Sequence, residues 1–298
     1  MATDRSLALQ PLEQLERKEA DDDLQKAIRA IVDELTAREP GARLGADIED
    51  VHKMRVATRR LRSLLRTARS ALADPDRGGR LRDELRWLAT LLGEVRDRDV
   101  LIEYLLAEIR TLEPGEAAAC GGLLELFDGE RADSRRELVT ALDSDRYKVL
   151  VRDLRSFASE PVLREGETFS SAAASEYQRL RRAGISLGKD PSDDELHELR
   201  IRAKRARYAA EALGDEEKPI SRFVERVKHL QDVLGEHQDA AIAEQRLREL
   251  VEALRGSGRT ALAVGRLIER QRGRRLAGRA AWREAWKRLE QAGDKAFR

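Results

Sequence analysis

The stretch Val51–Leu72 spaces its basic and apolar residues with the period of an α-helix. Six basic residues recur at steps of three and four positions, so a helix would carry all of them on one face. These residues are His52, Arg55, Arg59, Arg62, Arg66 and Arg69. Leu61, Leu64 and Leu65 fall on the opposite face, where a helix packs against a core. The stretch therefore predicts an amphipathic helix with one strongly basic face.

No acidic residue interrupts the sequence between Val51 and Ala73. Surface helices usually mix charges, because like charges four positions apart cost roughly 0.2–0.5 kcal/mol each. A basic face of this length would accumulate on the order of 1–2 kcal/mol of repulsion. We therefore expect either acidic residues of a neighbouring helix or an anionic ligand to neutralise it.

The same pattern occurs a second time, 145 positions later, in Leu196–Leu213. Both stretches contain the string H-x-x-R-[VI]-x-x-[RK]-R-x-R. The second copy meets an acid at Glu211, so we expect its basic face to be shorter. The matched pairs are His52 with His197, Arg55 with Arg200, Arg59 with Lys204, Arg60 with Arg205, and Arg62 with Arg207.

Two further landmarks repeat in the same order. LLGEVRD at Leu91–Asp97 matches VLGEHQD at Val233–Asp239, and ERADSRR at Glu130–Arg136 matches ERQRGRR at Glu269–Arg275. Three landmarks in one order indicate an internal duplication of a unit of roughly four helices. We place the boundary at residues 160 and 161, which gives a first half of residues 1–160 and a second half of residues 161–298.

A duplication lets both basic faces line one shared channel, if the halves pack about a pseudo-twofold axis. Guanidinium groups suit such a channel because they bind phosphate oxygens in pairs and keep their charge. The last long helix of each half carries further arginines that we expect at the flanks of this channel. They are Arg131, Arg135, Arg270, Arg274 and Arg275.

Glycine, proline and aspartate give the expected ends of the helices. We expect Pro40-Gly41 to end the first helix, either Asp47 or Asp50 to cap the basic helix, and Asp74-Pro75-Asp76 with Gly78-Gly79 to stop it. Gly93 would mark a bend or an end, with the helix capped anew at Asp97. A single helix is expected to run from Arg131 through Tyr147 toward Phe157.

Composition supports an all-α fold and argues against several functional classes. Aromatic residues make up 4% of the chain and charged residues 38%, with Ala, Leu, Arg and Glu abundant. The net charge of +1 opposes a general nucleic-acid binder, which would be more basic overall. Cys120 stands alone, which rules out a disulfide framework. We see no membrane-spanning run and no signal peptide, and expect a cytosolic protein.

The duplicated string and the paired L-G-E-x-x-D segments resemble the CHAD domain, the conserved histidine α-helical domain, from about residue 15 to residue 295. This resemblance implies two four-helix bundles related by a pseudo-twofold axis around a basic central channel. It also implies binding of inorganic polyphosphate and association with polyphosphate granules. CHAD domains are often fused to a triphosphate-tunnel catalytic domain, for which we see no length here.

The family resemblance assigns the channel to eight residues of the two basic helices. They are His52, Arg55, Arg59, Arg62, His197, Arg200, Lys204 and Arg207. The same helices add Arg60, Arg66 and Arg205 to the predicted binding set, and the flanking helices add Arg131, Arg135, Arg270 and Arg274. The two histidines would either donate to phosphate oxygens or pack against a neighbouring helix.

The leading hypothesis is a non-catalytic module that binds inorganic polyphosphate, with no cofactor and no metal site. The residues show no complete metal-binding string, no Ser-His-Asp arrangement and no phosphate-binding loop. We read Asp97 and Asp239 as helix caps, and His229 and His237 as structural or surface residues. One alternative is a phosphohydrolase or phosphotransferase that acts on polyphosphate. The other is a helical nucleic-acid-binding module, and the lack of base-reading and stacking groups argues against it.

Overall fold

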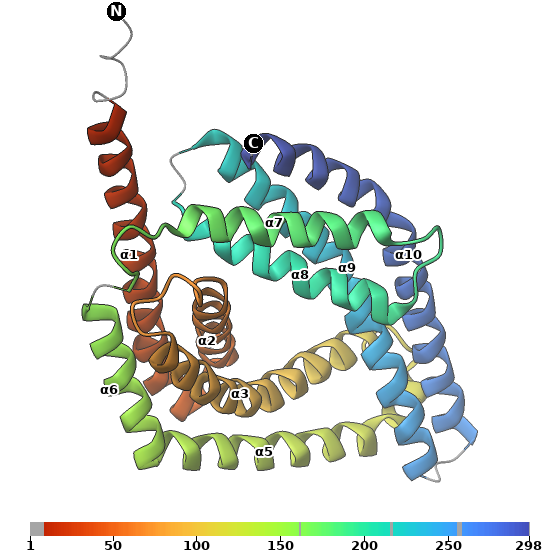
Figure 1. The fold of residues 1–298 in the computed structure, drawn as a ribbon. Helices are drawn as coiled ribbons and strands as arrows, with labels where there is room; N and C mark the ends of the chain where they lie inside the picture. The colour runs from red at the N-terminus through yellow and green to blue at the C-terminus, as the bar shows by residue number, and fades with distance from the viewer. Residues whose placement is uncertain (1–8, 161, 215–216, 255–257, 298) are drawn as a thin grey trace, which may run out of the picture.

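The computed structural model describes residues 9–160, 162–214, 217–254 and 258–297. In this part of the chain every regular element is a helix (Figure 1). Its only β pairing there is an isolated antiparallel bridge between Leu72 and Leu163. The all-α prediction is confirmed. Residues 1–8 and Pro161, which the predicted halves include, lie outside the described residues. The helices are α1 (Leu9–Leu44), α2 (Ile48–Thr67), α3 (Pro75–Ile109), α4 (Pro114–Ala119), α5 (Gly121–Asp143), α6 (Asp145–Ser159), α7 (Phe169–Ser186), α8 (Asp193–Glu211), α9 (Lys218–Leu254) and α10 (Gly258–Ala296).

Helix α1 continues through Pro40-Gly41, so the predicted end there was wrong. The chain leaves the helix at Gly45, whose φ of 69° lies in the left-handed region that glycine adopts without strain. Gly41 has another role, because a Cβ at this position would overlap the side chain of Asp50 in α2. The cap of α2 is Asp47, whose Oδ1 accepts from the amide of Glu49 at 2.8 Å.

Helix α3 is also longer than predicted, because none of the expected glycine breaks occurs. Asp74 caps it by accepting from the amide of Arg77 at 2.8 Å. Gly78 and Gly79 lie inside the helix, and Gly78 leaves room for Leu72. The helix passes through Gly93 without ending. A continuous α3 of 35 residues therefore reaches from the α2 end of the molecule to α9 and α10 (Figure 1).

The helix expected from Arg131 to Phe157 is divided at Ser144 into α5 and α6, which meet at a sharp corner (Figure 1). Ser144 has an extended backbone and accepts through Oγ from the amide of Tyr147 at 3.3 Å. Serine is a favoured N-cap, so the chain can restart a helix here in a new direction. The prediction of one unbroken helix was wrong.

Three clusters of buried apolar side chains hold the helices together. The first joins α1, α2, α3 and α6 to Phe169 of α7 and Ala209 of α8. The second lies among α7, α8, α9 and α10. The third joins Leu105 of α3 and Phe127 of α5 to Leu267 of α10. Two of the three clusters thus combine residues from both sides of the predicted boundary.

The core fixes the direction of both basic faces. In α2 the side chains of Leu61, Leu64 and Leu65 are buried, as predicted. In α8 the buried positions include Leu199 and Ala203. Helices α2 and α8 pack against each other, so the basic residues between these apolar positions gather beside the contact.

Candidate functional site: a basic cavity between α2 and α8

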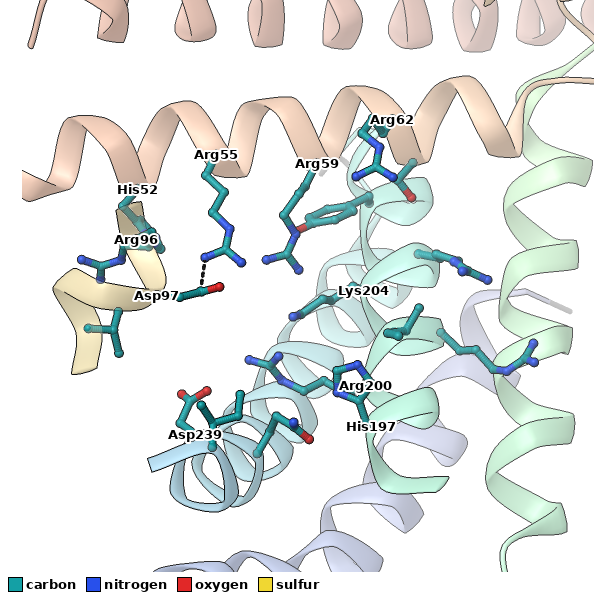
Figure 2. Close-up of a pocket in the computed structure, with 18 of the residues that line it drawn as sticks. His52, Arg55, Arg59, Arg62, Arg96, Asp97, His197, Arg200, Lys204 and Asp239 are labelled. Carbon is teal, nitrogen blue, oxygen red and sulfur yellow. Dashed lines mark hydrogen bonds and ion pairs between the residues drawn. The ribbon is translucent and has the colours of Figure 1, made fainter. Parts of the chain in front are cut away.

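A cavity of about 1490 Å³ lies beside the contact of α2 with α8, and α3, α7, α9 and α10 complete its wall. Figure 2 shows the basic side chains of α2 and α8 pointing into it. Fourteen arginine and lysine residues line this cavity against four aspartate and glutamate residues. The cavity thus concentrates positive charge in a chain whose net charge is only +1.

Most of the predicted binding residues meet in this cavity. All six residues of the α2 basic face line it, including Arg69, which the predicted binding set did not contain. The predicted residues that line the wall are His52, Arg55, Arg59, Arg62, Arg66, His197, Arg200, Lys204, Arg205 and Arg274.

Arg60 and Arg207, although part of the duplicated string, lie outside the cavity lining. Arg60 approaches Glu34 at 3.9 Å and Glu211 at 3.8 Å. Arg207 approaches Glu211 at 3.5 Å, and its guanidinium lies over the ring of Tyr208. These two arginines are neutralised by neighbouring acids, which is the alternative that the sequence left open.

Three predicted flank residues also lie away from the lining. Arg131 pairs with Asp128 one turn earlier in α5, at 3.6 Å. Arg135 lies against Gly45 at the end of α1. Arg270 pairs with Glu108 of α3 at 3.0 Å. Arg275 also lies outside the lining and pairs with Glu244 at 3.4 Å, so Arg274 is the one predicted flank residue on the cavity wall.

Arg59, Arg200 and Lys204 form the centre of the site, which we call the crossing cluster (Figure 2). None of the three has an ion pair within 4.0 Å to a carboxylate of the described residues. Burial, together with the positive charges of Arg59, Arg200 and Arg55, lowers the pKa of Lys204 to about 6. Burial also lowers the pKa of Arg59 and of Arg200. Two guanidinium groups without a carboxylate partner, beside an amine that a bound anion would protonate, indicate a site for an anion.

Buried donors near this cluster lack partners in the described structure. Arg62 Nε and His197 Nδ1 are shielded from solvent and form no hydrogen bond. Burial lowers the pKa of His52, with Arg96 contributing in the same direction. A buried polar group without a partner costs about 1–3 kcal/mol, which an oxyanion ligand would remove by accepting these bonds.

The predicted capping roles of Asp97 and Asp239 were wrong, because both residues lie within continuous helices and line the cavity. Asp97 accepts from Arg55 Nη1 at 2.7 Å (Figure 2). Burial raises the pKa of Asp239, and the charge of Arg200 opposes that rise. Each carboxylate thus faces the arginine of one copy of the duplicated string.

The glycine of the second L-G-E segment makes room for Arg200, whereas a side chain at the matched Gly93 would be in ordinary contact with Arg55. A Cβ at Gly235 would stand 3.1 Å from Arg200 Nη2, and one at Gly93 would stand 3.8 Å from Arg55 Nη2. Glycine inside a helix costs about 1 kcal/mol relative to alanine. At Gly235 the missing side chain leaves space for the guanidinium group of Arg200 between the helices, and the helix continues.

Five further arginines line the cavity that no sequence pattern predicted there. They come from α3, α7 and α8, and the first two lie one turn apart near the start of α3. They are Arg82, Arg86, Arg96, Arg179 and Arg202. The helical spacing of Arg82 and Arg86 puts them on one face, but only the position of α3 beside α2 shows which face.

The remaining histidines and acids do not form a metal centre in the described residues. His237 is 1% exposed and contacts Asp193 Oδ1 at 3.2 Å, as expected of a structural residue. His229 is exposed, as a surface residue would be. Within the described residues there is no group of three or more His, Cys, Asp or Glu side chains placed to hold a metal ion.

Comparison with known proteins places this architecture in a family. The CHAD domain matches residues 26–248. The uncharacterized proteins MT2285 and Rv2226 of Mycobacterium tuberculosis (strains CDC 1551 / Oshkosh and ATCC 25618 / H37Rv) are each 31% identical over 289 residues. Each match covers 92% of this chain and 54% of the relative, so the chain spans about half the length of these relatives.

Two solved structures share the fold. PptA from Streptomyces chartreusis has a TM-score of 0.76 and 25% identity, covering 90% of this chain and 99% of that one. The CHAD domain from the plant Ricinus communis has a TM-score of 0.72 and 24% identity, covering 90% of this chain and 91% of that one. With the family matched over most of the sequence and the fold shared with a solved member, this chain belongs to the CHAD domain family.

Proposed function

We propose that the cavity binds inorganic polyphosphate and does not cleave it. The observation that carries this proposal is the crossing cluster, in which Arg59, Arg200 and Lys204 come from two helices and face no described carboxylate within 4.0 Å. A polymer of phosphate groups supplies closely spaced oxygens for all three side chains. Charge-assisted hydrogen bonds to such oxygens are the strongest that arginine and lysine form.

The lining favours a polymer without bases over a nucleic acid. Tyr104 and Tyr208 are the aromatic residues of the described lining. Tyr208 is 5% exposed, and the ring of Tyr104 is covered by the guanidinium of Arg274 at 4.6 Å. Neither offers the free ring face on which single-stranded bases stack. Repeated phosphate without bases would use the cavity in full.

We extend the proposal to the origin of the site, a duplicated unit whose two copies face a common basic channel. Arg59 of α2 and Lys204 of α8 are matched positions of the string, and both belong to the crossing cluster. The matched glycines Gly93 and Gly235 each lie next to the arginine of their own copy. Such paired environments support a pseudo-twofold relation between the halves.

The proposal that the protein does not cleave polyphosphate rests on the contacts that the acidic residues of the cavity make. Phosphoryl-transfer sites hold divalent cations with carboxylates. Asp97 instead accepts a hydrogen bond from Arg55, and Glu236 accepts one from Arg274. We assign the binding of polyphosphate to this cavity. We propose that the protein acts in the cytosol, in association with polyphosphate granules. None of the described helices has an apolar stretch long enough to cross a membrane.

The proposal is tested by mixing the protein with long-chain polyphosphate and Mg²⁺ or Mn²⁺ over a range of salt concentrations. We expect tight retention at low salt and a steep loss as salt rises, because each cation displaces counterions from the polymer. Gel analysis should show an unchanged chain length. An affinity that hardly depends on salt would contradict binding in the cavity. Metal-dependent shortening of the polymer that is lost on changing Asp97 or Asp239 would instead support the enzymatic alternative.

A further inference from the structure

The positive charge of the cavity continues beyond the crossing cluster toward the C-terminal end of α2. The C-terminal part of α2, the turn after it and the first turns of α3 place five arginines on this side, which we call the rim cluster. Arg62 is the link, since its electrostatic neighbours include Arg59 of the crossing cluster as well as Arg82 and Arg86 of α3. The rim cluster consists of Arg62, Arg66, Arg69, Arg82 and Arg86.

The rim cluster is poor in acids. Asp83 lies 3.8 Å from Arg82 and 3.4 Å from Arg86, so two arginines share one carboxylate. Arg62, Arg66 and Arg69 have no ion pair within 4.0 Å to an acid of the described residues. Arg66, Arg69 and Arg86 are also exposed, so a ligand that leaves the cavity can reach them.

The opposite side of the cavity has its cations neutralised. Arg55 is 2.7 Å from Asp97, and Arg274 pairs with Glu236. Asp239 adds another carboxylate to the same wall, and Figure 2 shows Asp97 and Asp239 on the side away from Arg62. A polyanion is therefore attracted more strongly toward the rim cluster than toward the wall of α3 and α9 that carries these acids.

We propose that the rim cluster is an extension site for polyphosphate chains too long for the crossing cluster, and that Arg82 and Arg86 set a preference for long chains. This inference rests on the proposed function, since it concerns the same polymer. Short polyphosphate would occupy the crossing cluster alone. A long chain would continue along α2 and gain contacts with Arg82 and Arg86.

The test compares tripolyphosphate with long-chain polyphosphate at low salt. The variants are R82E/R86E, the milder R82Q/R86Q, and the control R152E/R155E on exposed positions of α6. We expect R82E/R86E to bind long chains about 10- to 100-fold more weakly, and R82Q/R86Q to lose a smaller factor. Both should bind tripolyphosphate within about twofold of the unchanged protein, because contacts outside a ligand's reach do not affect it. For long chains, the slope of log affinity against log salt should become shallower by about one unit or more, because the variants displace fewer counterions.

Several outcomes would overturn the extension site. One is long-chain binding by R82E/R86E and R82Q/R86Q equal to that of the control. Another is an equal loss for both chain lengths, which would place Arg82 and Arg86 in the central site. Tripolyphosphate that fails to bind while long chains bind would also contradict the division into two clusters. If the unchanged protein binds neither polymer, the proposed function itself fails. Thermal melts separate these results from misfolding.

Discussion

Changing Arg59 and Lys204 together to glutamate should weaken polyphosphate binding by at least about 100-fold while the protein stays folded. Each change removes charge-assisted hydrogen bonds of roughly 1.5–3 kcal/mol and adds repulsion. A loss of about 3 kcal/mol corresponds to roughly 100-fold in affinity. The melting temperature of the free protein should equal or exceed that of the unchanged chain, because the change relieves repulsion within the crossing cluster.

The matched control for this variant is K148E/R152E, which makes the same change of charge on α6. Lys148 and Arg152 have side-chain exposures of 66% and 72%, and neither lines the cavity. We expect the control to bind polyphosphate nearly as the unchanged protein does. If R59E/K204E melts at a much lower temperature, these residues have a structural role. If it is folded and binds as tightly as the control, the ligand lies elsewhere.

The second large effect should be a fall in affinity as pH rises from about 6 to 8. In the free protein the pKa of Lys204 is about 6, so the side chain is largely neutral at pH 8. Phosphate oxygens beside it would favour the ammonium form and raise its pKa, so binding takes up a proton in this range. Linkage limits the fall to about tenfold per pH unit, or on the order of 100-fold over the whole range.

The lowered pKa of Lys204 makes the stability of the free protein rise with pH, whereas it makes the affinity for polyphosphate fall. Unfolded, Lys204 has a pKa near 10.5, so between pH 6 and that value the unfolded chain binds more protons than the folded one. The contribution of Lys204 therefore makes the free protein more stable as pH rises through this range. Its charged neighbours are Arg59, Arg200, Arg55 and Arg207.

The control for the pH prediction is K204R, which keeps a positive charge at every pH tested. Calorimetry in buffers of different ionisation enthalpy counts the protons taken up on binding. We expect close to one proton at pH 8 for the unchanged protein and close to none for K204R, with long-chain polyphosphate used so that terminal phosphates contribute little. Equal proton uptake by both proteins would show that another group causes the pH dependence.

The sequence predicted the two faces of α2 and α8 well because their periodicity is a local property. Leu61 and Leu64 are buried, and all six residues of the basic face of Val51–Leu72 line the cavity. The exposed side of α3 could not be assigned in this way. Arg82 and Arg86 line the cavity only because α3 packs beside α2, a relation that no local pattern carries.

The errors at helix ends also have a physical cause. Gly93 has a low helix propensity, but at about 1 kcal/mol relative to alanine this is too small to end a helix that packs along its length. The break between α5 and α6 follows from one residue of the matched segments. Ser144 corresponds to Arg283 of α10, and serine caps a new helix where arginine does not. The duplicated segments therefore differ in shape while their motifs agree.

The central claim is that the cavity selects a polymer of phosphate alone. The most direct test is a side-by-side titration of the protein with long-chain polyphosphate, short RNA and duplex DNA, at equal phosphate concentration and roughly 0.15 M salt. We expect polyphosphate to bind at least about tenfold more tightly than either nucleic acid, because the lining supplies cations without base-reading or stacking groups. Equal or tighter binding of duplex DNA or RNA would contradict the account.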